Sequence, residues 1–239
     1  MKQMRLFLLL LLSLSTPLCF SSLDSQLFPV HESHQANVDF WKKIFGEYSP
    51  TEAVIHDRHD LSIIYRVVKL VDKNLPNSKK INKKRIQSAQ QEISKTLNHL
   101  ARGNRPASPK EKKIAAMFGK TASPDRYRQA AKQIRVQSGA KDRFAKGIIR
   151  SGRYLREMQN IFKQYDLPPE LTYLPHVESS FNPAAYSKYG AAGVWQFIRS
   201  TGKIYMRIGE SLDERRDPIL ATHAAAKLLK KNYAELSSW

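Results

Sequence analysis

The sequence predicts an all-α protein, and three observations support this. Apolar residues recur at helical spacing in several stretches, most clearly in residues 38–48 (VDFWKKIFGEY). Two helix starts have a capping serine followed by proline, at Ser108-Pro109 and at Ser123-Pro124. We find no strand alternation of useful length and no internal repeat in the chain.

The elements are expected in a simple order along the chain. Residues 38–48 form a packing helix, and a second apolar pattern follows over residues 51–71. A basic break over residues 77–84 precedes a helix over about residues 85–100. After the two capped helices, residues 141–165 form one amphipathic helix with arginines and lysines opposite its apolar face.

The N-terminus predicts export. Two basic residues precede an apolar run over residues 6–14, and small residues near Cys19 offer a cleavage site. We therefore expect residues 1–21 to be a signal peptide, too short for a stable membrane anchor, and the mature protein to reside in the periplasm or cell envelope. Lipid anchoring through Cys19 is the alternative, although the residues before that cysteine match a lipidation site poorly.

The positive charge is concentrated in one part of the chain. The net charge is +19, and residues 66–163 contain 26 Lys and Arg against 6 Asp and Glu. We expect a basic helical region over residues 22–150 that contacts an anionic envelope surface or polymer. The alternative is a solvated outer face, the commoner meaning of a basic stripe. Export makes nucleic acid a poor partner, so we expect none.

One carboxylate lies in a stretch with the composition of an active site. Leu171, Leu174, Glu178 and Phe181 share a helical spacing, which puts Glu178 on an apolar stripe. Burial there raises the pKa of a carboxyl group, as a general acid requires. Pro175 lacks an amide hydrogen, so the helix that carries Glu178 either kinks or begins there.

The residues after Glu178 predict the rest of a cleft. Gly193 allows a close backbone approach or a positive φ. If residues 193–197 are extended, Trp195 and Phe197 form an apolar wall and Gln196 faces away from them. The alternative is a purely structural set: a buried glutamate paired with an arginine, a glycine turn and a core tryptophan.

The run ESSFNPAAYSKYGAAGVWQF resembles the signature of lytic transglycosylases with an SLT domain. LPPELTYLPHVESSFNP is similar to their membrane-bound type D branch, and DERRDPILATHAAAKLL extends the resemblance, which covers roughly residues 154–239. It implies a lysozyme-like helical domain over residues 151–239, with Glu178 as catalytic acid and base. Ser187 and Gln196 correspond to residues that hydrogen-bond the sugar, and we add Gly193, Trp195 and Phe197 as substrate-binding residues.

The resemblance also implies a reaction and a substrate. Family members cut the β-1,4 bond between N-acetylmuramic acid and N-acetylglucosamine in peptidoglycan and leave a 1,6-anhydro ring. The stretch offers a single carboxylate, which fits this reaction: protonated Glu178 donates to the leaving oxygen and then accepts a proton from the C6 hydroxyl of the same sugar. No cofactor and no metal are expected.

Several alternatives remain open. The family has an Ala-Tyr-Asn-x-Gly segment that would follow Trp239, so we expect the domain to be cut short at its C-terminus. A non-catalytic peptidoglycan-binding scaffold and a lysozyme-type hydrolase are therefore the rival functions. The cluster His56-Asp57-Arg58-His59-Asp60 has metal-ligand residue types, but we interpret it as polar residues at a helix boundary.

Overall fold

A computed structural model describes residues 27–239. The predicted signal peptide over residues 1–21, including Cys19, lies outside the described residues. Within residues 27–239, no helix combines the length and the apolar character that crossing a membrane requires.

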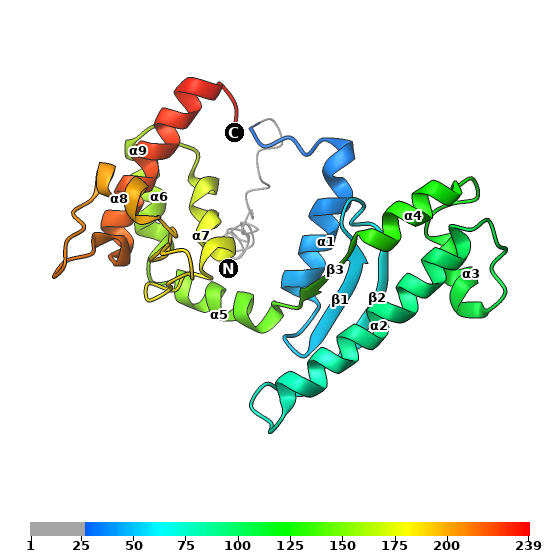
Figure 1. The fold of residues 1–239 in the computed structure, drawn as a ribbon. Coiled ribbons are helices and arrows are strands. Elements are labelled where there is room, and N and C mark those ends of the chain that lie inside the picture. The colour runs from blue at the N-terminus through cyan, green and yellow to red at the C-terminus, as the bar shows by residue number, and fades with distance from the viewer. Residues whose placement is uncertain (1–26) are drawn as a thin grey trace, which may run out of the picture.

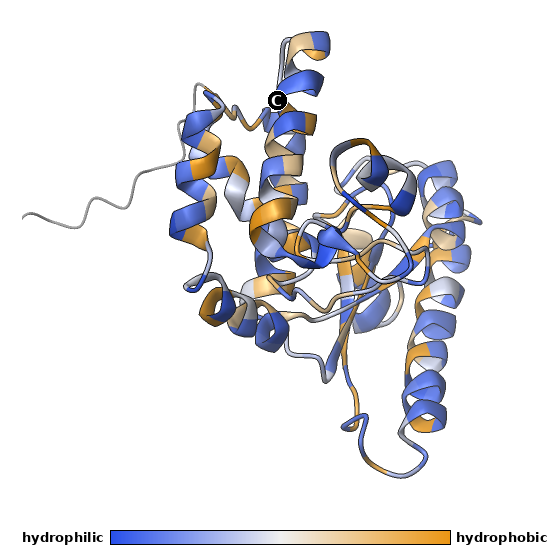
Figure 2. Ribbon diagram, turned by 90° about the vertical axis from the view of Figure 1, so that its left-hand side faces the viewer, coloured by the Kyte–Doolittle hydropathy of each residue, from blue (hydrophilic) through white to orange (hydrophobic). Residues whose placement is uncertain are grey.

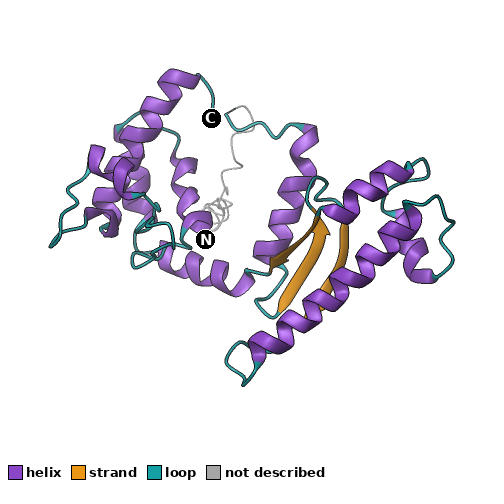
Figure 3. Cartoon of the chain, in the orientation of Figure 1, coloured by secondary structure: helices purple, strands orange, loops and turns teal. Residues whose placement is uncertain are grey.

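Helices make up most of the described chain (Figure 1, Figure 3). The α-helices are α1 (Gln35–Gly46), α2 (Ser78–Leu100), α3 (Pro109–Ala116), α4 (Pro124–Lys132), α5 (Lys141–Ser151), α6 (Leu155–Gln164), α7 (Leu174–Glu178), α8 (Arg199–Tyr205) and α9 (Pro218–Leu236). Short 3-10 helices are η1 (Glu32–His34), η2 (Pro169–Tyr173) and η3 (Glu214–Arg216). The strands are β1 (Glu52–Asp57), β2 (Ile64–Lys69) and β3 (Ile134–Ser138).

The all-α prediction is wrong for the N-terminal half, because three strands form an antiparallel sheet in the order β2-β1-β3. The predicted apolar pattern over residues 51–71 is the hairpin of β1 and β2. The central strand β1 is buried on both faces, with Val54 and Ile55 each fully inaccessible. A strand buried on both faces shows a continuous apolar run instead of alternation, so its sequence resembles a short buried helix.

Helices cover both faces of this sheet (Figure 1). Ile55 packs with Ile93 and Leu97 of α2 and with residues of α3 and α4. Val54 points to the other face and packs with Phe40 and Ile44 of α1. Figure 2 shows α2 as largely hydrophilic, interrupted by the hydrophobic residues that it buries on the sheet.

The helix starts predicted from caps are confirmed, but two helix bounds are wrong. Ser108 and Glu111 form a capping box at α3, and Ser123 caps α4. The predicted basic break over residues 77–84 lies inside α2, which begins at Ser78. The predicted helix over residues 141–165 is divided into α5 and α6 by a turn at residues 152–154.

The C-terminal half has its own helical core. Phe162 of α6, Phe181 and Val194 are fully buried and pack against the alanines of α9, whose small side chains allow close approach. Helix α5 joins the two halves. Its Phe144 contacts Phe45 of α1, at a ring-centroid distance of 5.2 Å, and His176 of α7, at 5.5 Å.

Candidate functional site

Glu178 is the last residue of α7 and lines a pocket of about 290 Å³. The wall of the pocket comes from α7, the 195–198 turn, α8 and α9. It consists of Leu174, Glu178, Trp195, Gln196, Phe197, Ile198, Thr201, Ala225, Leu228 and Leu229. Apart from Glu178, Gln196 and Thr201 this lining is apolar, so one carboxylate and one amide are the polar groups best placed to orient a bound sugar.

The prediction that Glu178 is buried on an apolar stripe is wrong. Its side chain is exposed, and Leu174 is 40% exposed, whereas Phe181 is fully buried. The helical spacing does not hold because α7 ends at Glu178. Ser180 and Phe181 follow with φ values of 54° and 53°, in the left-handed region, so Phe181 turns into the core independently of Glu178.

Two contacts fix the turn formed by residues 178–182. The Ser179 hydroxyl donates to the carbonyl oxygen of Val194 at 2.8 Å. The guanidinium of Arg150, on α5, donates from Nη2 and Nε to the carbonyl oxygen of Ser180 at 2.7 and 3.0 Å. Two non-glycine residues in the left-handed region are held in place by such contacts, a form of strain that is common at functional sites.

Residues 193–197 are not extended, so the predicted division into two faces is wrong. They form a tight turn closed by a bridge between Ala192 and Phe197. The backbone N–H of Ala192 donates to the carbonyl oxygen of Phe197 at 3.0 Å. Trp195 and Phe197 are 9% and 6% exposed and belong to the C-terminal core. The indole N–H of Trp195 donates to the hydroxyl of Thr222 at 2.9 Å, and its ring stacks on Phe162. Both aromatic residues also form part of the pocket wall beside Glu178.

Of the remaining predicted substrate-binding residues, Gln196 lies in the pocket wall, whereas Ser187 and Gly193 do not. Gln196 lines the pocket with Glu178, at a φ of 50°, and its amide donates to the carbonyl oxygen of Gly193 at 2.9 Å. Ser187 does not line this pocket. Its hydroxyl accepts from the backbone N–H groups of Tyr189 and Ala191, which shapes the loop before the turn. Gly193 also lies outside the pocket lining, and a Cβ there would come within 1.7 Å of the carbonyl oxygen of Arg215.

Arg215 organises the loop, and the sequence interpretation missed this role. Only 2% of the residue is exposed. Its guanidinium donates to the carbonyl oxygens of Gly190 and Phe197 at 2.8 and 3.0 Å, and forms an ion pair with Asp213. Hydrogen bonding from Arg215 lowers the pKa of Asp213, so the ion pair persists in mild acid. The one signal in the sequence is that Arg215 stands two residues after a carboxylate, Asp213.

His176, two residues before Glu178, is buried beside the site. It is 9% exposed and lies among the rings of Phe144, Tyr173 and Phe181. Burial lowers the pKa of His176, and its Nδ1 atom has no hydrogen-bond partner in the described structure. The neutral imidazole therefore acts as a packing group between α5 and α7.

The cluster over residues 56–60 comprises the end of β1 and the bend that follows it, so its interpretation as a helix boundary is wrong. Asp57 is fully buried, and its carboxylate accepts from the N–H groups of His59 and Asp60 and from the hydroxyl of Tyr65. Arg126 of α4 completes the set with an ion pair at 3.3 Å. No group of three or more potential metal ligands occurs within residues 27–239.

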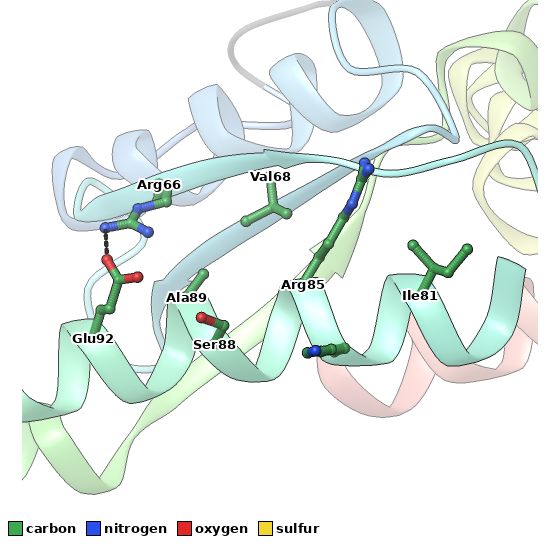
Figure 4. Close-up of a pocket in the computed structure, with 8 residues that line it drawn as sticks. Arg66, Val68, Ile81, Arg85, Ser88, Ala89 and Glu92 are labelled. Carbon is green, nitrogen blue, oxygen red and sulfur yellow. Dashed lines mark hydrogen bonds and ion pairs between the residues drawn. The ribbon is translucent and has the colours of Figure 1, made fainter.

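A second pocket, of about 530 Å³, lies between β2 and α2 (Figure 4). Three of its four charged groups are already engaged, Lys84 being the other: Arg66 pairs with Glu92 at 3.0 Å, and Arg85 donates to the carbonyl oxygen of Lys69 at 2.9 Å. Because most charged groups of this second pocket are paired within the protein, the Glu178 pocket is the stronger candidate for chemistry.

Comparison with known proteins finds similarity in the C-terminal third of the chain. Residues 158–239 match the family model described as Transglycosylase SLT domain. Membrane-bound lytic murein transglycosylase D of Escherichia coli (strain K12) is 38% identical over 84 residues, which cover 35% of this chain and 19% of that protein. A protein of Alteromonas sp. (strain M-1), named for tributyltin chloride resistance, is 34% identical over 82 residues, or 34% of this chain and 40% of the relative. The chain thus spans about a fifth of the length of the E. coli relative.

Proposed function

We propose that this protein is a peptidoglycan lytic transglycosylase whose catalytic acid and base is Glu178, because residues 158–239 match the transglycosylase SLT domain model. The observation that carries the proposal is the pocket in which Glu178 and Gln196 share an otherwise largely apolar wall. The E. coli relative is named as a murein transglycosylase, which agrees with this substrate.

The proposed reaction uses one carboxyl group twice. Protonated Glu178 gives its proton to the glycosidic oxygen as the bond between the two sugars breaks. The resulting carboxylate then takes the proton of the C6 hydroxyl, and that oxygen closes on C1 of the same N-acetylmuramic acid. The sugar supplies its own nucleophile, so no second carboxylate is required.

Because Glu178 is exposed, we propose that the bound substrate itself excludes water from the site. The apolar side chains of Leu174, Trp195 and Phe197 surround the pocket on the protein side. A glycan strand lying across the open side removes water from the site, so the proton transfers between Glu178 and the sugar take place in a dry cleft. In this proposal the acid becomes competent when the substrate binds. Ser187, which lies outside the pocket lining, contributes by shaping the loop that ends in Gln196.

We propose that residues 1–21 direct export and that the protein acts in the cell envelope. Its proposed domain organisation is a basic N-terminal region over residues 22–150, followed by the SLT domain over residues 151–239. The partner is the glycan strand of peptidoglycan. This organisation keeps the N-terminal sheet and the Glu178 pocket in one molecule, joined through α5.

Mass spectrometry of purified peptidoglycan digested with this protein tests the proposal. We expect products one water lighter than hydrolysed fragments, because a 1,6-anhydro ring replaces the reducing end. Glu178→Gln should abolish them, whereas Glu210→Gln, which changes an exposed carboxylate outside the pocket, should not. Products of full hydrolysed mass would contradict transglycosylation and support a lysozyme-type reaction.

A non-catalytic peptidoglycan-binding protein is the second candidate function. The observation that favours it is the exposure of Glu178, whose carboxylate has no hydrogen-bond partner among residues 27–239 that would orient it. Under this alternative the unmodified protein binds peptidoglycan in a sedimentation assay but releases no fragments, and Glu178→Gln binds equally well.

A further inference from the structure

A third pocket, of about 590 Å³, lies between the two halves of the molecule and is rich in basic residues. Its lining includes Lys73 after β2, Asn82 of α2, and Arg143, Lys146 and Arg150 of α5. Asp72 and Asp142 also line it, so the cations outnumber the carboxylates by four to two. We call this the interlobe pocket.

Three of the four cations of the interlobe pocket are available to a ligand. Lys73, Arg143 and Lys146 are exposed and form no ion pair with any residue from 27 to 239. Arg150 is partly buried and already donates to Ser180. The nearby Asn82 amide is also engaged, because it holds the backbone of Val71 at 2.9 Å. The free cations therefore come from two different elements around one hollow.

The interlobe pocket adjoins the Glu178 pocket through a shared turn. Ser179 and Asn182 line the interlobe pocket, and Glu178, directly before Ser179, lines the other. The lining of the interlobe pocket therefore begins one residue after Glu178 in the chain, close to a polymer bound at Glu178.

The chemistry of the proposed substrate matches this arrangement. The sugars of a glycan strand offer hydroxyl and acetamido groups, whereas the peptide stems attached to N-acetylmuramic acid bear free carboxylates. Lysine and arginine bind carboxylates through charge-assisted hydrogen bonds. From this complementarity we propose that the interlobe pocket binds the carboxylates of a peptide stem on the strand that occupies the Glu178 pocket.

This proposal rests on peptidoglycan as the ligand, as the proposed function does, but it concerns binding and not cleavage. It gives the N-terminal half a role in substrate selection, because Lys73 comes from the segment between β2 and α2. It also predicts a preference for strands that retain charged stems.

The test measures binding in a Glu178→Gln background, which prevents turnover. The ligands are purified glycan strands with native stems, and the same strands after carbodiimide-mediated amidation of their carboxylates. The variant is Lys73→Gln/Lys146→Gln. Its matched control is Lys112→Gln/Lys113→Gln, which removes two exposed charges from α3, outside the pocket.

We expect the Lys73/Lys146 variant to raise the Kd for native strands about fivefold, the combined effect of two solvent-accessible ion pairs. Its Kd for amidated strands should equal that of the parent protein, and the control should discriminate between the strands as the parent does. Equal weakening for both ligands, or no weakening for native strands, overturns the proposal. Anionic lipid vesicles serve as a third ligand. If the Lys73/Lys146 variant loses binding only to these vesicles, the proposal is overturned and the pocket is assigned to a membrane surface.

A second measurement separates this proposal from the proposed function. If the parent protein with Glu178 intact releases no fragments, transglycosylation fails, while charge-dependent strand binding still tests the interlobe pocket. If fragments are released but binding ignores amidation, the reaction stands and the interlobe pocket is not a stem site. Matching thermal unfolding midpoints for all variants confirm that the substitutions leave the fold intact.

Discussion

Each half of the molecule is organised around one buried charge, and the two charges have opposite signs. In the N-terminal half, Asp57 accepts from two backbone N–H groups, from Tyr65 and from Arg126. In the C-terminal half, Arg215 donates to two backbone carbonyl oxygens and pairs with Asp213. Asp57 satisfies backbone groups of the turn that directly follows it, whereas Arg215 satisfies those of a loop about 20 residues earlier in the chain.

The difference between the two centres explains why only one of them supports a candidate active site. The carboxylate of Asp57 binds the backbone N–H of His59 and the guanidinium of Arg126 on α4, so these polar groups are not available to a ligand. Arg215 holds the loop from Gly190 to Phe197 by its carbonyl groups, which leaves the side chain of Gln196 at the edge of the Glu178 pocket. A cation beneath the loop therefore shapes a site without itself entering it.

The substitution with the largest expected effect is Arg215→Met. It removes the side-chain donor from the carbonyl oxygens of Gly190 and Phe197 and from the Asp213 carboxylate. We expect a loss of about 4 kcal/mol in the free energy of unfolding, measured by urea denaturation, because removal of one member of a buried ion pair is strongly destabilising. Arg216→Met, at an exposed neighbour, should change it by less than about 1 kcal/mol. Equal effects would show that the buried cation does not organise the loop.

The glycines of the same loop provide a matched pair. Gly193→Ala introduces a Cβ that meets the Arg215 carbonyl oxygen at 1.7 Å, at a φ of +76°. Left-handed strain and the steric clash together should cost about 3 kcal/mol of folding free energy. Gly190→Ala has a similar φ, of +80°, but its nearest neighbour is 3.7 Å away, so we expect about 1 kcal/mol. Denaturant midpoints for the two variants measure the difference, which vanishes if the close approach to Arg215 is not needed.

Asp57→Asn probes the N-terminal centre. The substitution keeps the shape of the side chain but removes its charge from the contacts with Arg126 and two N–H groups. We expect a loss of about 2 kcal/mol, the usual size for hydrogen bonds to a charged group. The fragments released from peptidoglycan should keep their masses, because the Glu178 pocket has no residue from this centre. A change in product type would show that the two halves are coupled chemically.

The smallest expected effect concerns pH and the two buried histidines. Burial lowers the pKa of His176 below its ordinary value of 6.5, so the folded state binds this proton less readily than the unfolded state. The contribution of His176 to stability is therefore complete above pH 6.5 and falls as the pH is lowered through that value.

His176→Phe should accordingly reduce the loss of stability between neutral pH and mild acid, as measured by thermal unfolding midpoints across that range. His56, whose pKa burial also lowers, remains in the variant, and its shift is opposed by the nearby carbonyl and carboxylate of Asp57. The comparison of His176→Phe with His56→Phe thus shows how far a polar partner offsets the lowering of a histidine pKa by burial. An unchanged pH profile for both variants would contradict this account.

Local sequence signals determined much of this protein. Helix starts with a capping side chain and a following proline, as at Ser108 and Ser123, act within a single turn and were predicted correctly. The SLT resemblance of the C-terminal third is confirmed over residues 158–239, and the signature pointed to Glu178 and Gln196, which share a pocket. These features depend on residues that are close together in the chain.

Only the tertiary structure decided the rest, because long-range contacts overrode local patterns. The strand β1 was hidden by its burial between α1 and α2, which replaces alternation with a continuous apolar run. The exposure of Glu178 follows from left-handed residues at 180 and 181, held by Arg150 from a separate helix. The interlobe pocket likewise brings Lys73 and Lys146 together across 73 residues of sequence, a distance over which no periodicity can be read.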